Sequence, residues 1–127
     1  YDIHNLFYLS NILIGYTALK RRTSYKENKK KRYLLFDTLV IAKDFRNLKL
    51  SRAIMSFNNK IIRNNKMRSF LICEKKLSKF YKKFSWSKIS KKNIVFEDYE
   101  TKKNFMSYNF NVKELNKKIK LAIYFNK

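Results

Sequence analysis

The chain has 127 residues, 45% of them hydrophobic and 17% aromatic, so it is long enough for one domain and too apolar for a disordered tail. Its 31 basic and 9 acidic residues give a net charge of +22, a self-repulsion that a polyanionic partner would relieve. One cysteine, one histidine and one glycine exclude an internal disulfide, a multi-cysteine zinc site and a glycine-rich phosphate loop.

The positive charge is concentrated in the middle of the chain. Residues 20–92 hold 24 of the 31 basic residues and 4 of the 9 acidic ones. Nucleic acid is therefore the first candidate partner and an anionic membrane surface the second.

Lys, Asn, Ile, Tyr and Phe are frequent while Gly, Pro and Ala are scarce, a bias typical of an A+T-rich genome. We expect a location in the mitochondrion, in the matrix.

The first stretch, residues 2–20, has helical spacing. Asp2 can cap the helix, and Leu6, Leu9 and Leu13 recur on one face. No basic residue precedes the apolar part and polar residues interrupt it, so neither a signal peptide nor a membrane span is expected. Residues 1–24 are predicted to form an apolar helix that faces a partner.

Two further helices are expected next. The stretch Ser24-Tyr25-Lys26-Glu27 has the spacing of a capping box and predicts a helix over about 25–45. Asn47 begins a shorter helix, LKLSRAIMSF. The asparagine pairs at 58–59 and 64–65 predict turns.

The second half of the chain is less regular. Residues 66–84 show no clean period, which predicts an irregular, extended segment held by its partner. Residues 94–100 predict a strand or extended segment, and Asn111 caps a last helix over about 112–125. The expected fold is therefore mainly α: several helices, an irregular and extended basic segment that packs on RNA, and a small core.

The stretch YKKFSWSKISKK, residues 81–92, alternates lysines with aromatic residues. No acid occurs between Lys75 and Lys92. Lysines neutralise phosphates and aromatic rings stack on unpaired bases, so this composition favours structured RNA. The alternative is a helix whose aromatic residues pack in the chain's own core, because Phe80 and Phe84 have helical spacing.

The candidate RNA-binding residues share a positive charge or an aromatic or hydroxyl group within the basic region 25–92 or next to it. They are Arg21, Arg22, Lys29, Lys30, Lys31, Arg32, Arg63, Arg68, Lys75, Lys76, Lys79, Tyr81, Lys82, Lys83, Trp86, Ser87, Lys88, Lys91 and Lys92.

Other reactive side chains predict no chemistry. Cys73 lies in the apolar run FLIC and is expected to be a buried thiol. The acids Glu97, Asp98 and Glu100 lack a supporting histidine, so they are expected to pair with lysines or with a basic neighbour protein. No catalytic residue, metal site or cofactor is expected, and the chain is not predicted to be an enzyme.

Residues 81–89, YKKFSWSKI, resemble the signature of the universal small-subunit ribosomal protein number fourteen, which reads roughly Tyr-Arg-Lys-Phe-Gly-Leu-Ser-Arg-Ile. The resemblance covers about residues 25–92. Leu71 stands where that family has a cysteine, and Glu74-Lys75-Lys76 replaces its Thr-Gly-Arg. The chain is thus similar to a zinc-free, divergent mitochondrial form, with 93–127 as a C-terminal extension.

The resemblance implies a structural constituent of a mitochondrial ribosome that binds rRNA in the head of the small subunit. Ribosomal RNA and neighbouring ribosomal proteins would be its partners, and it would have no small-molecule substrate. Two alternatives stay open: a lineage-specific mitoribosomal protein without a bacterial relative, and a peripheral subunit of a respiratory membrane complex.

Overall fold

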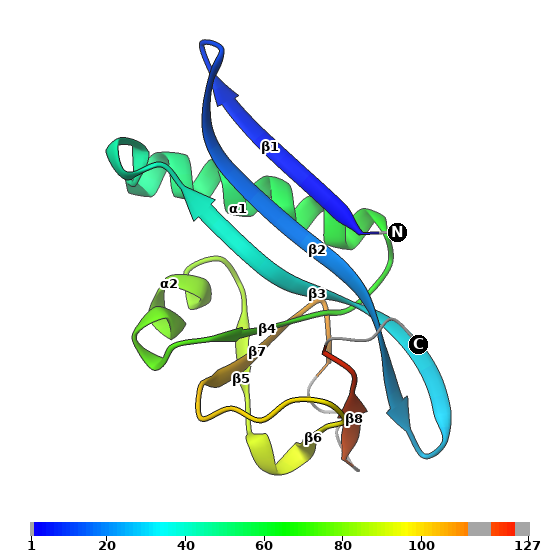
Figure 1. Ribbon diagram of the computed structural model, residues 1–127. Coiled ribbons are helices and arrows are strands. Elements are labelled where there is room, and N and C mark those ends of the chain that lie inside the picture. The colour runs from blue at the N-terminus through cyan, green and yellow to red at the C-terminus, as the bar shows by residue number, and fades with distance from the viewer. Residues whose placement is uncertain (1, 112–117, 124–127) are drawn as a thin grey trace.

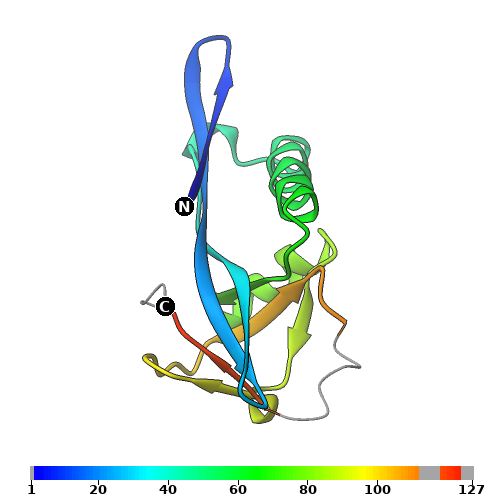
Figure 2. The ribbon, with the colours of Figure 1, turned by 90° about the vertical axis from the view of Figure 1, so that its right-hand side faces the viewer.

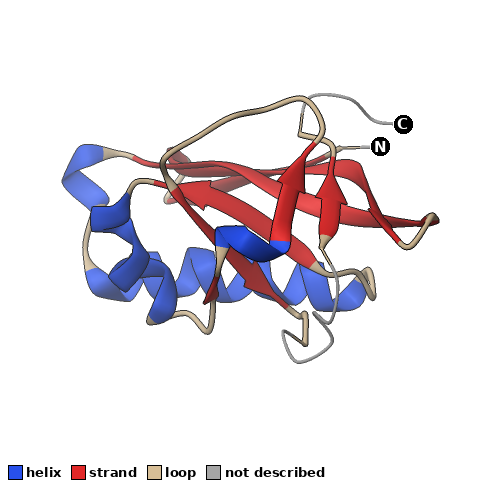
Figure 3. Ribbon diagram, turned by 90° about the horizontal axis from the view of Figure 1, so that it is seen from below, coloured by secondary structure: helices blue, strands red, loops and turns tan. Residues whose placement is uncertain are grey.

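The computed structural model describes residues 2–111 and 118–123. Of these, 47% lie in strands and 27% in helices. Eight strands form one sheet, in the order β5-β7-β4-β3-β2-β8-β6, with β1 paired to β2. Figures 1 and 3 show this curled sheet with the long helix α1 along one face. The expected mainly α fold is therefore wrong.

The chain begins with three antiparallel strands, β1 (Ile3–Leu9), β2 (Ile12–Lys26) and β3 (Lys29–Ile41). The helices predicted over 2–20 and 25–45 are absent. Two-residue turns join the strands, and their central residues Ser10-Asn11 and Glu27-Asn28 all have positive φ, between 46° and 67°. Such turns match the twist of a hairpin, and asparagine tolerates positive φ well.

Helix α1 (Leu48–Asn64) begins where the sequence predicted, since the Asn47 side chain accepts a hydrogen bond from the Leu50 amide at 3.0 Å. The helix runs through the asparagine pair at 58–59, so the turn predicted there is wrong; both side chains are buried. The turn predicted at 64–65 is confirmed, because α1 ends at Asn64.

The chain then returns to the sheet. Strand β4 (Ser69–Cys73) lies parallel to β3, and β7 (Asn104–Tyr108) pairs with β4 in antiparallel fashion. Regular structure therefore replaces much of the irregular segment expected over 66–84. The remaining elements are η1 (Lys43–Phe45), η2 (Lys75–Leu77), α2 (Ser78–Lys82), β5 (Ser87–Ile89), η3 (Lys91–Asn93), β6 (Ile94–Phe96) and β8 (Ile119–Leu121).

The prediction of an extended segment at 94–100 is confirmed in β6. Most of the final helix predicted over 112–125 lies outside the described residues, and Ile119–Leu121 form a strand instead. Strands from all three expected regions, 1–24, 25–92 and 93–127, share the sheet. Whether these regions differ in function stays a prediction.

Two apolar clusters lie on opposite faces of the sheet. Leu34 and Phe36 of β3 join the cluster that contains Met55 of α1, whereas Tyr33 and Leu35 join a second cluster with β8. This division follows from the alternation of side chains along a strand. Figure 2 shows α1 on one side of β1–β3.

Among the described residues, no helix has the length and apolar character needed to cross a bilayer.

Candidate active-site cleft

The adjacent parallel strands β3 and β4 separate shortly after they meet. Only Leu34 with Ser69 and Leu35 with Phe70 are paired, and the Leu34 amide donates to the Arg68 carbonyl at 3.0 Å. Beyond this point the two strands diverge (Figure 1). The backbone N–H and C=O groups of successive residues in a strand point to alternate sides. Those of Leu34 point toward β4, so those of Phe36, two residues further on, point toward the gap between β3 and β4. The sheet therefore contains a wedge with open backbone edges.

A β-bulge lies at the apex of this wedge. Leu19 of β2 pairs with Phe36, but Ala18 pairs with Thr38, so Asp37 is an extra residue in β3. Bulges bend a strand and increase its twist, and they are frequent next to functional sites. The bulge accounts for the turn of β3 away from β4.

A cleft of about 560 Å³ lies between the end of β3, the beginning of α1 and α2. Its lining is mostly apolar on the strand and on α2, and polar where α1 begins. The lining residues are Leu39, Val40, Ile41, Arg46, Asn47, Leu48, Ser51, Leu77, Phe80, Tyr81 and Lys83.

The beginning of α1 is suited to an anion. The first helical turn carries no acid and includes Lys49, although the positive end of a helix dipole favours acids. Arg46 and Lys49 are exposed there, and the Arg46 Nε donates a hydrogen bond to the Ile41 carbonyl oxygen at 2.8 Å. Amides in the first turn of a helix lack intrahelical partners, and the Asn47 side chain caps only that of Leu50. This end of the cleft therefore offers both N–H donors and cations.

Tyr81 extends from α2 into the cleft lining. Its ring lies 6.1 Å from that of Phe36 and 6.4 Å from that of Trp86, measured between centroids. Burial, with a smaller contribution from Cys73, raises the pKa of Tyr81 to about 12. The phenol consequently keeps its proton at neutral pH and is a hydrogen-bond donor.

Trp86, expected to pack on bases, is 2% exposed. Its Nε1 donates to Asn59 Oδ1 at 3.0 Å, and its ring stacks on Tyr108. The ring has no free face for a base in this arrangement. Phe84 is buried as well, as the alternative of aromatic residues packed in the chain's own core requires.

The candidate RNA-binding cations come from several elements, among them β2, β3, α1, α2 and η3. Arg22 is 9% exposed and its Nε donates to the Ile123 carbonyl at 2.6 Å. Arg68 lies over the Phe110 ring. Whether the set binds RNA stays a prediction. Most of the other residues in the candidate RNA-binding set are exposed, and these are Lys29, Lys30, Lys31, Arg32, Arg63, Lys75, Lys76, Lys79, Lys82, Lys83, Ser87, Lys88, Lys91 and Lys92.

Sequence reasoning missed most of the cleft. Of the lining residues it singled out Tyr81, for base packing, and Lys83, for phosphate contact, but not Arg46. The available signal was an exposed basic loop directly before a capped helix. The expectation for Cys73 is confirmed: the thiol is buried, which raises its pKa. Over the described residues, no group of His, Cys, Asp and Glu side chains is placed to hold a metal ion.

The fold matches solved structures of GNAT-family N-acetyltransferases. YhbS of Escherichia coli, in complex with CoA, superimposes with a TM-score of 0.65 at 13% identity over 88% of this chain and 61% of that chain. YlbP of Bacillus subtilis, in complex with coenzyme A, superimposes with a TM-score of 0.60 at 16% identity over 83% of this chain and 66% of that chain. PaiA of Thermoplasma acidophilum, also in complex with coenzyme A, superimposes with a TM-score of 0.58 at 18% identity over 86% of this chain and 61% of that chain.

The chain thus spans about two thirds or less of the length of these three structures. No protein-family model matches the sequence, and no curated protein matches it significantly. The likeness lies in the three-dimensional arrangement: the chain has the GNAT fold.

This likeness corrects the ribosomal predictions. The resemblance to ribosomal protein fourteen is wrong. The predictions that followed from it are wrong too, namely a structural role in the small subunit of a mitochondrial ribosome and rRNA and ribosomal proteins as partners. Both alternatives, a lineage-specific mitoribosomal protein and a peripheral subunit of a respiratory complex, are equally unsupported. The predictions of no enzymatic activity and no small-molecule substrate are contradicted too, since the neighbours are acetyltransferases that bind CoA. The matching stretch 81–89 spans the end of α2, a turn at Ser85 and β5. Its aromatic residues Phe84 and Trp86 are buried in the core.

Proposed function

We propose that this chain binds an acyl-coenzyme A in the cleft and transfers the acyl group to an amine. The observation that carries this proposal is the wedge between β3 and β4, which opens into a cleft with cations at one end and Tyr81 in its lining. The GNAT fold, found in neighbours solved with coenzyme A, supports it. The mitochondrial location inferred from composition stays a prediction.

Coenzyme A has a phosphate-bearing end and a thin pantetheine arm that carries amides and the thiol. The phosphates fit the beginning of α1, where Arg46, Lys49 and the first-turn amides supply charge and donors. Because the loop 42–47 contains no glycine, cationic side chains would carry more of this contact than a close backbone cradle would.

The pantetheine arm fits the apolar walls of the cleft, including Leu39, Ile41 and Phe80. Its amides can pair with the open edge of β3 as an added strand would. This pairing directs the thioester toward the apex of the wedge, near Phe36. Backbone N–H groups at the bulge can then stabilise negative charge on the acyl oxygen.

Tyr81 is the proposed proton donor to the leaving sulfur. As the amine forms its C–N bond and the C–S bond breaks, the phenol passes its proton to the thiolate. It recovers a proton from the nitrogen of the acceptor. The raised pKa keeps the phenol protonated before each cycle. Loss of such a group typically costs about 10²–10⁴-fold in rate.

The experiment measures coenzyme A binding by isothermal titration calorimetry and thiol release from acetyl-CoA in the presence of amines. We expect wild type to bind coenzyme A, and the double variant Arg46→Gln/Lys49→Gln to bind about tenfold more weakly. Tyr81→Phe should bind coenzyme A as wild type does but release thiol at least about 100-fold more slowly.

The matched control is Lys102→Gln/Lys103→Gln, which removes the same charge from exposed positions outside the cleft lining. Its coenzyme A affinity should stay within about twofold of wild type, because distant surface charges are screened by salt. Equal losses in both double variants would mean a general charge effect. Absence of coenzyme A binding by folded wild type would overturn the proposed function.

A further inference from the structure

A second candidate site lies at the end of the β2–β3 hairpin, outside the cleft. Two hollows of about 280 and 570 Å³ meet there and share Lys31, Arg68 and Phe110. The cations that line this basic hollow are Lys26, Lys29, Lys31, Lys66 and Arg68, and its lining acid is Glu27. We propose that the basic hollow binds a small anion with two or more phosphate groups. This site would exist whether or not the cleft transfers an acyl group.

The register of the hairpin brings lysines together on one face of the sheet. Lys26 is paired with Lys29, and Lys31 points to the same side of β3 as Lys29, two residues before it. Like charges directly opposite each other destabilise a strand pair. Among the described residues, no acid outside the hairpin turn lines the hollow. An anion bound between the lysines would relieve their repulsion.

Arg68 adds a donor that is already held in place. Its Nη2 donates to Ser24 Oγ at 2.6 Å, and its guanidinium carbon lies 5.3 Å from the centre of the Phe110 ring. The Ser24 hydroxyl in turn donates to the Lys31 carbonyl at 2.9 Å. These contacts fix a planar fork beside the lysines, and such forks bind phosphate oxygens through paired hydrogen bonds. A fixed donor loses less side-chain freedom when a ligand binds.

The lining indicates the class of anion. Four of the cations surround the smaller hollow, whose volume of about 280 Å³ suits a compact ligand. A terminal phosphate group carries a charge of about −1.5 to −2 at neutral pH, so two or three linked groups would balance these cations. The larger hollow adds Lys66, Asn109 and Asn111 as further polar residues. An inorganic oligophosphate, or a small molecule that carries one, therefore fits better than an apolar ligand.

The basic hollow is remote from the proposed coenzyme cleft. Lys31 lines the hollow and Leu39 lines the cleft, and they are about 25 Å apart along β3. Figure 1 places the β2–β3 turn at the opposite end of β3 from η1. Lys31 also lies on the side of β3 that carries Tyr33, whose cluster faces away from α1. Phosphates bound at the beginning of α1 would therefore not occupy the hollow.

The test measures the binding of inorganic triphosphate by isothermal titration calorimetry at about 150 mM salt, where exposed charges more than about 8 Å apart are largely screened. All proteins carry Arg46→Gln/Lys49→Gln, so that the cations of the cleft do not hold the probe. We expect this background to bind triphosphate. Adding Lys29→Gln/Lys31→Gln should weaken the binding at least about tenfold, because it removes two charged donors.

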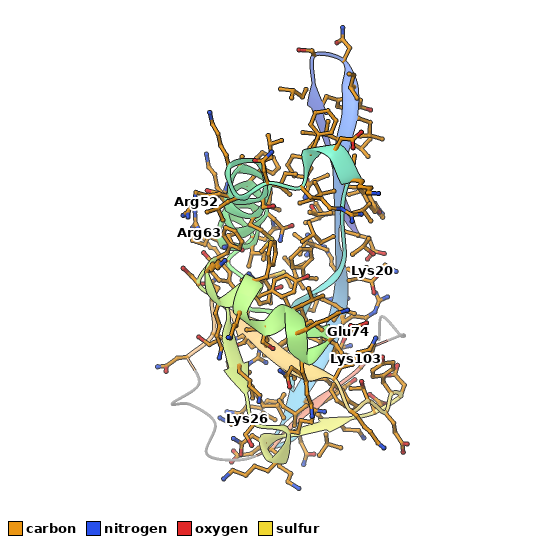
Figure 4. The ribbon with its side chains drawn as sticks, turned by 90° about the vertical axis from the view of Figure 1, so that its left-hand side faces the viewer. Lys20, Lys26, Arg52, Arg63, Glu74 and Lys103 are labelled. Atoms are coloured by element: carbon orange, nitrogen blue, oxygen red, sulfur yellow. The ribbon has the colours of Figure 1, made fainter. Side chains whose placement is uncertain are left out.

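The matched control adds Lys102→Gln/Lys103→Gln instead, which removes the same charge from exposed positions outside the hollow. Figure 4 shows Lys103 well apart from Lys26, which lines the hollow. The affinity of this control for triphosphate should stay within about twofold of the background. Arg68→Lys, which keeps the charge but loses the fork, should bind about tenfold more weakly, with its fold checked by far-UV circular dichroism.

Three outcomes would overturn the proposal. The first is no binding by the folded background at about 1 mM triphosphate. The second is an equal loss in the two added lysine pairs, which would mean attraction by the net charge alone. The third is tighter binding of a single-stranded oligonucleotide with the same dependence on Lys29 and Lys31, which would replace the small anion by a nucleic acid.

The affinity for coenzyme A separates the basic hollow from the cleft. In an otherwise wild-type chain, Lys29→Gln/Lys31→Gln should bind coenzyme A within about twofold of wild type. A tenfold loss would overturn the hollow as a separate site, because the phosphates of the coenzyme would then occupy it. Failure of wild type to bind coenzyme A would overturn the proposed function and leave the triphosphate result unaffected.

Discussion

Replacing Asn59 by alanine removes the polar link between α1 and the segment that follows α2. The Asn59 amide donates from Nδ2 to the Phe84 carbonyl at 2.9 Å and accepts at Oδ1 from Trp86 Nε1 at 3.0 Å. All three residues are at most 6% exposed. After the substitution the indole N–H and the carbonyl would both be buried without these partners.

The magnitude follows from the number of orphaned groups. Each buried donor or acceptor left without a partner costs about 1–3 kcal/mol, so the two together cost about 2–6 kcal/mol. Alanine also favours a helix over asparagine by up to about 0.7 kcal/mol. Asn64→Ala, at the exposed end of the same helix, serves as the control for that gain.

The assay is urea unfolding at constant temperature, followed by far-UV circular dichroism and by the fluorescence of Trp86, the only tryptophan. We expect the free energy of unfolding of Asn59→Ala to lie at least about 2 kcal/mol below that of Asn64→Ala. A difference under about 1 kcal/mol would refute the reasoning, because the Asn59 bridge would then add no more than an ordinary hydrogen bond.

Two further outcomes can be checked on the same protein. A Cβ on Gly15 would lie 2.9 Å from Ile54 Cδ1 and 3.3 Å from the Val40 carbonyl oxygen. Gly15→Ala should therefore lower the free energy of unfolding by about 1–3 kcal/mol, and by less in an Ile54→Val background, as a double-mutant cycle in urea would show. Because the pKa of Tyr81 is raised from 10.0 to about 12, the unfolded state loses this proton first as pH rises. The stability of wild type relative to Tyr81→Phe should be constant below pH 10 and fall by up to about 1.4 kcal/mol per pH unit from 10 to 12, measured by urea unfolding at each pH.

Local signals in the sequence gave correct predictions where the structure is local. The start of α1 at Asn47, its end near Asn64 and the extended residues of β6 each depend on neighbours in the chain. The spacing of Ser24 and Glu27 gave the wrong prediction, because it also fits a hairpin. Glu27 is in the turn with a φ of 51°, and Ser24 Oγ donates across the hairpin to the Lys31 carbonyl at 2.9 Å.

The cleft could not be predicted because it depends on contacts between distant residues. The wedge exists because Leu34 pairs with Ser69 and Leu35 with Phe70 while the residues beyond these two pairs do not pair, and a one-residue slip between β2 and β3 marks its apex. Neither feature has a signature in composition or period. The positive charge was also misleading: it predicts an anionic partner, and phosphates of coenzyme A are one among several that satisfy it.

The aromatic residues of the basic segment have a structural role at the wedge. Phe36 of β3 and Leu71 of β4 belong to one cluster with Phe84 and Trp86, and Tyr81 packs against it. These side chains pack together on the face of the sheet that α1 covers, where β3 and β4 separate, so extending the pairing of β3 with β4 would require these buried rings to repack. Expelling even one such ring would expose apolar surface worth about 1.5–3 kcal/mol. The rings expected to stack on bases are thus part of what keeps the proposed acyl-coenzyme A cleft open.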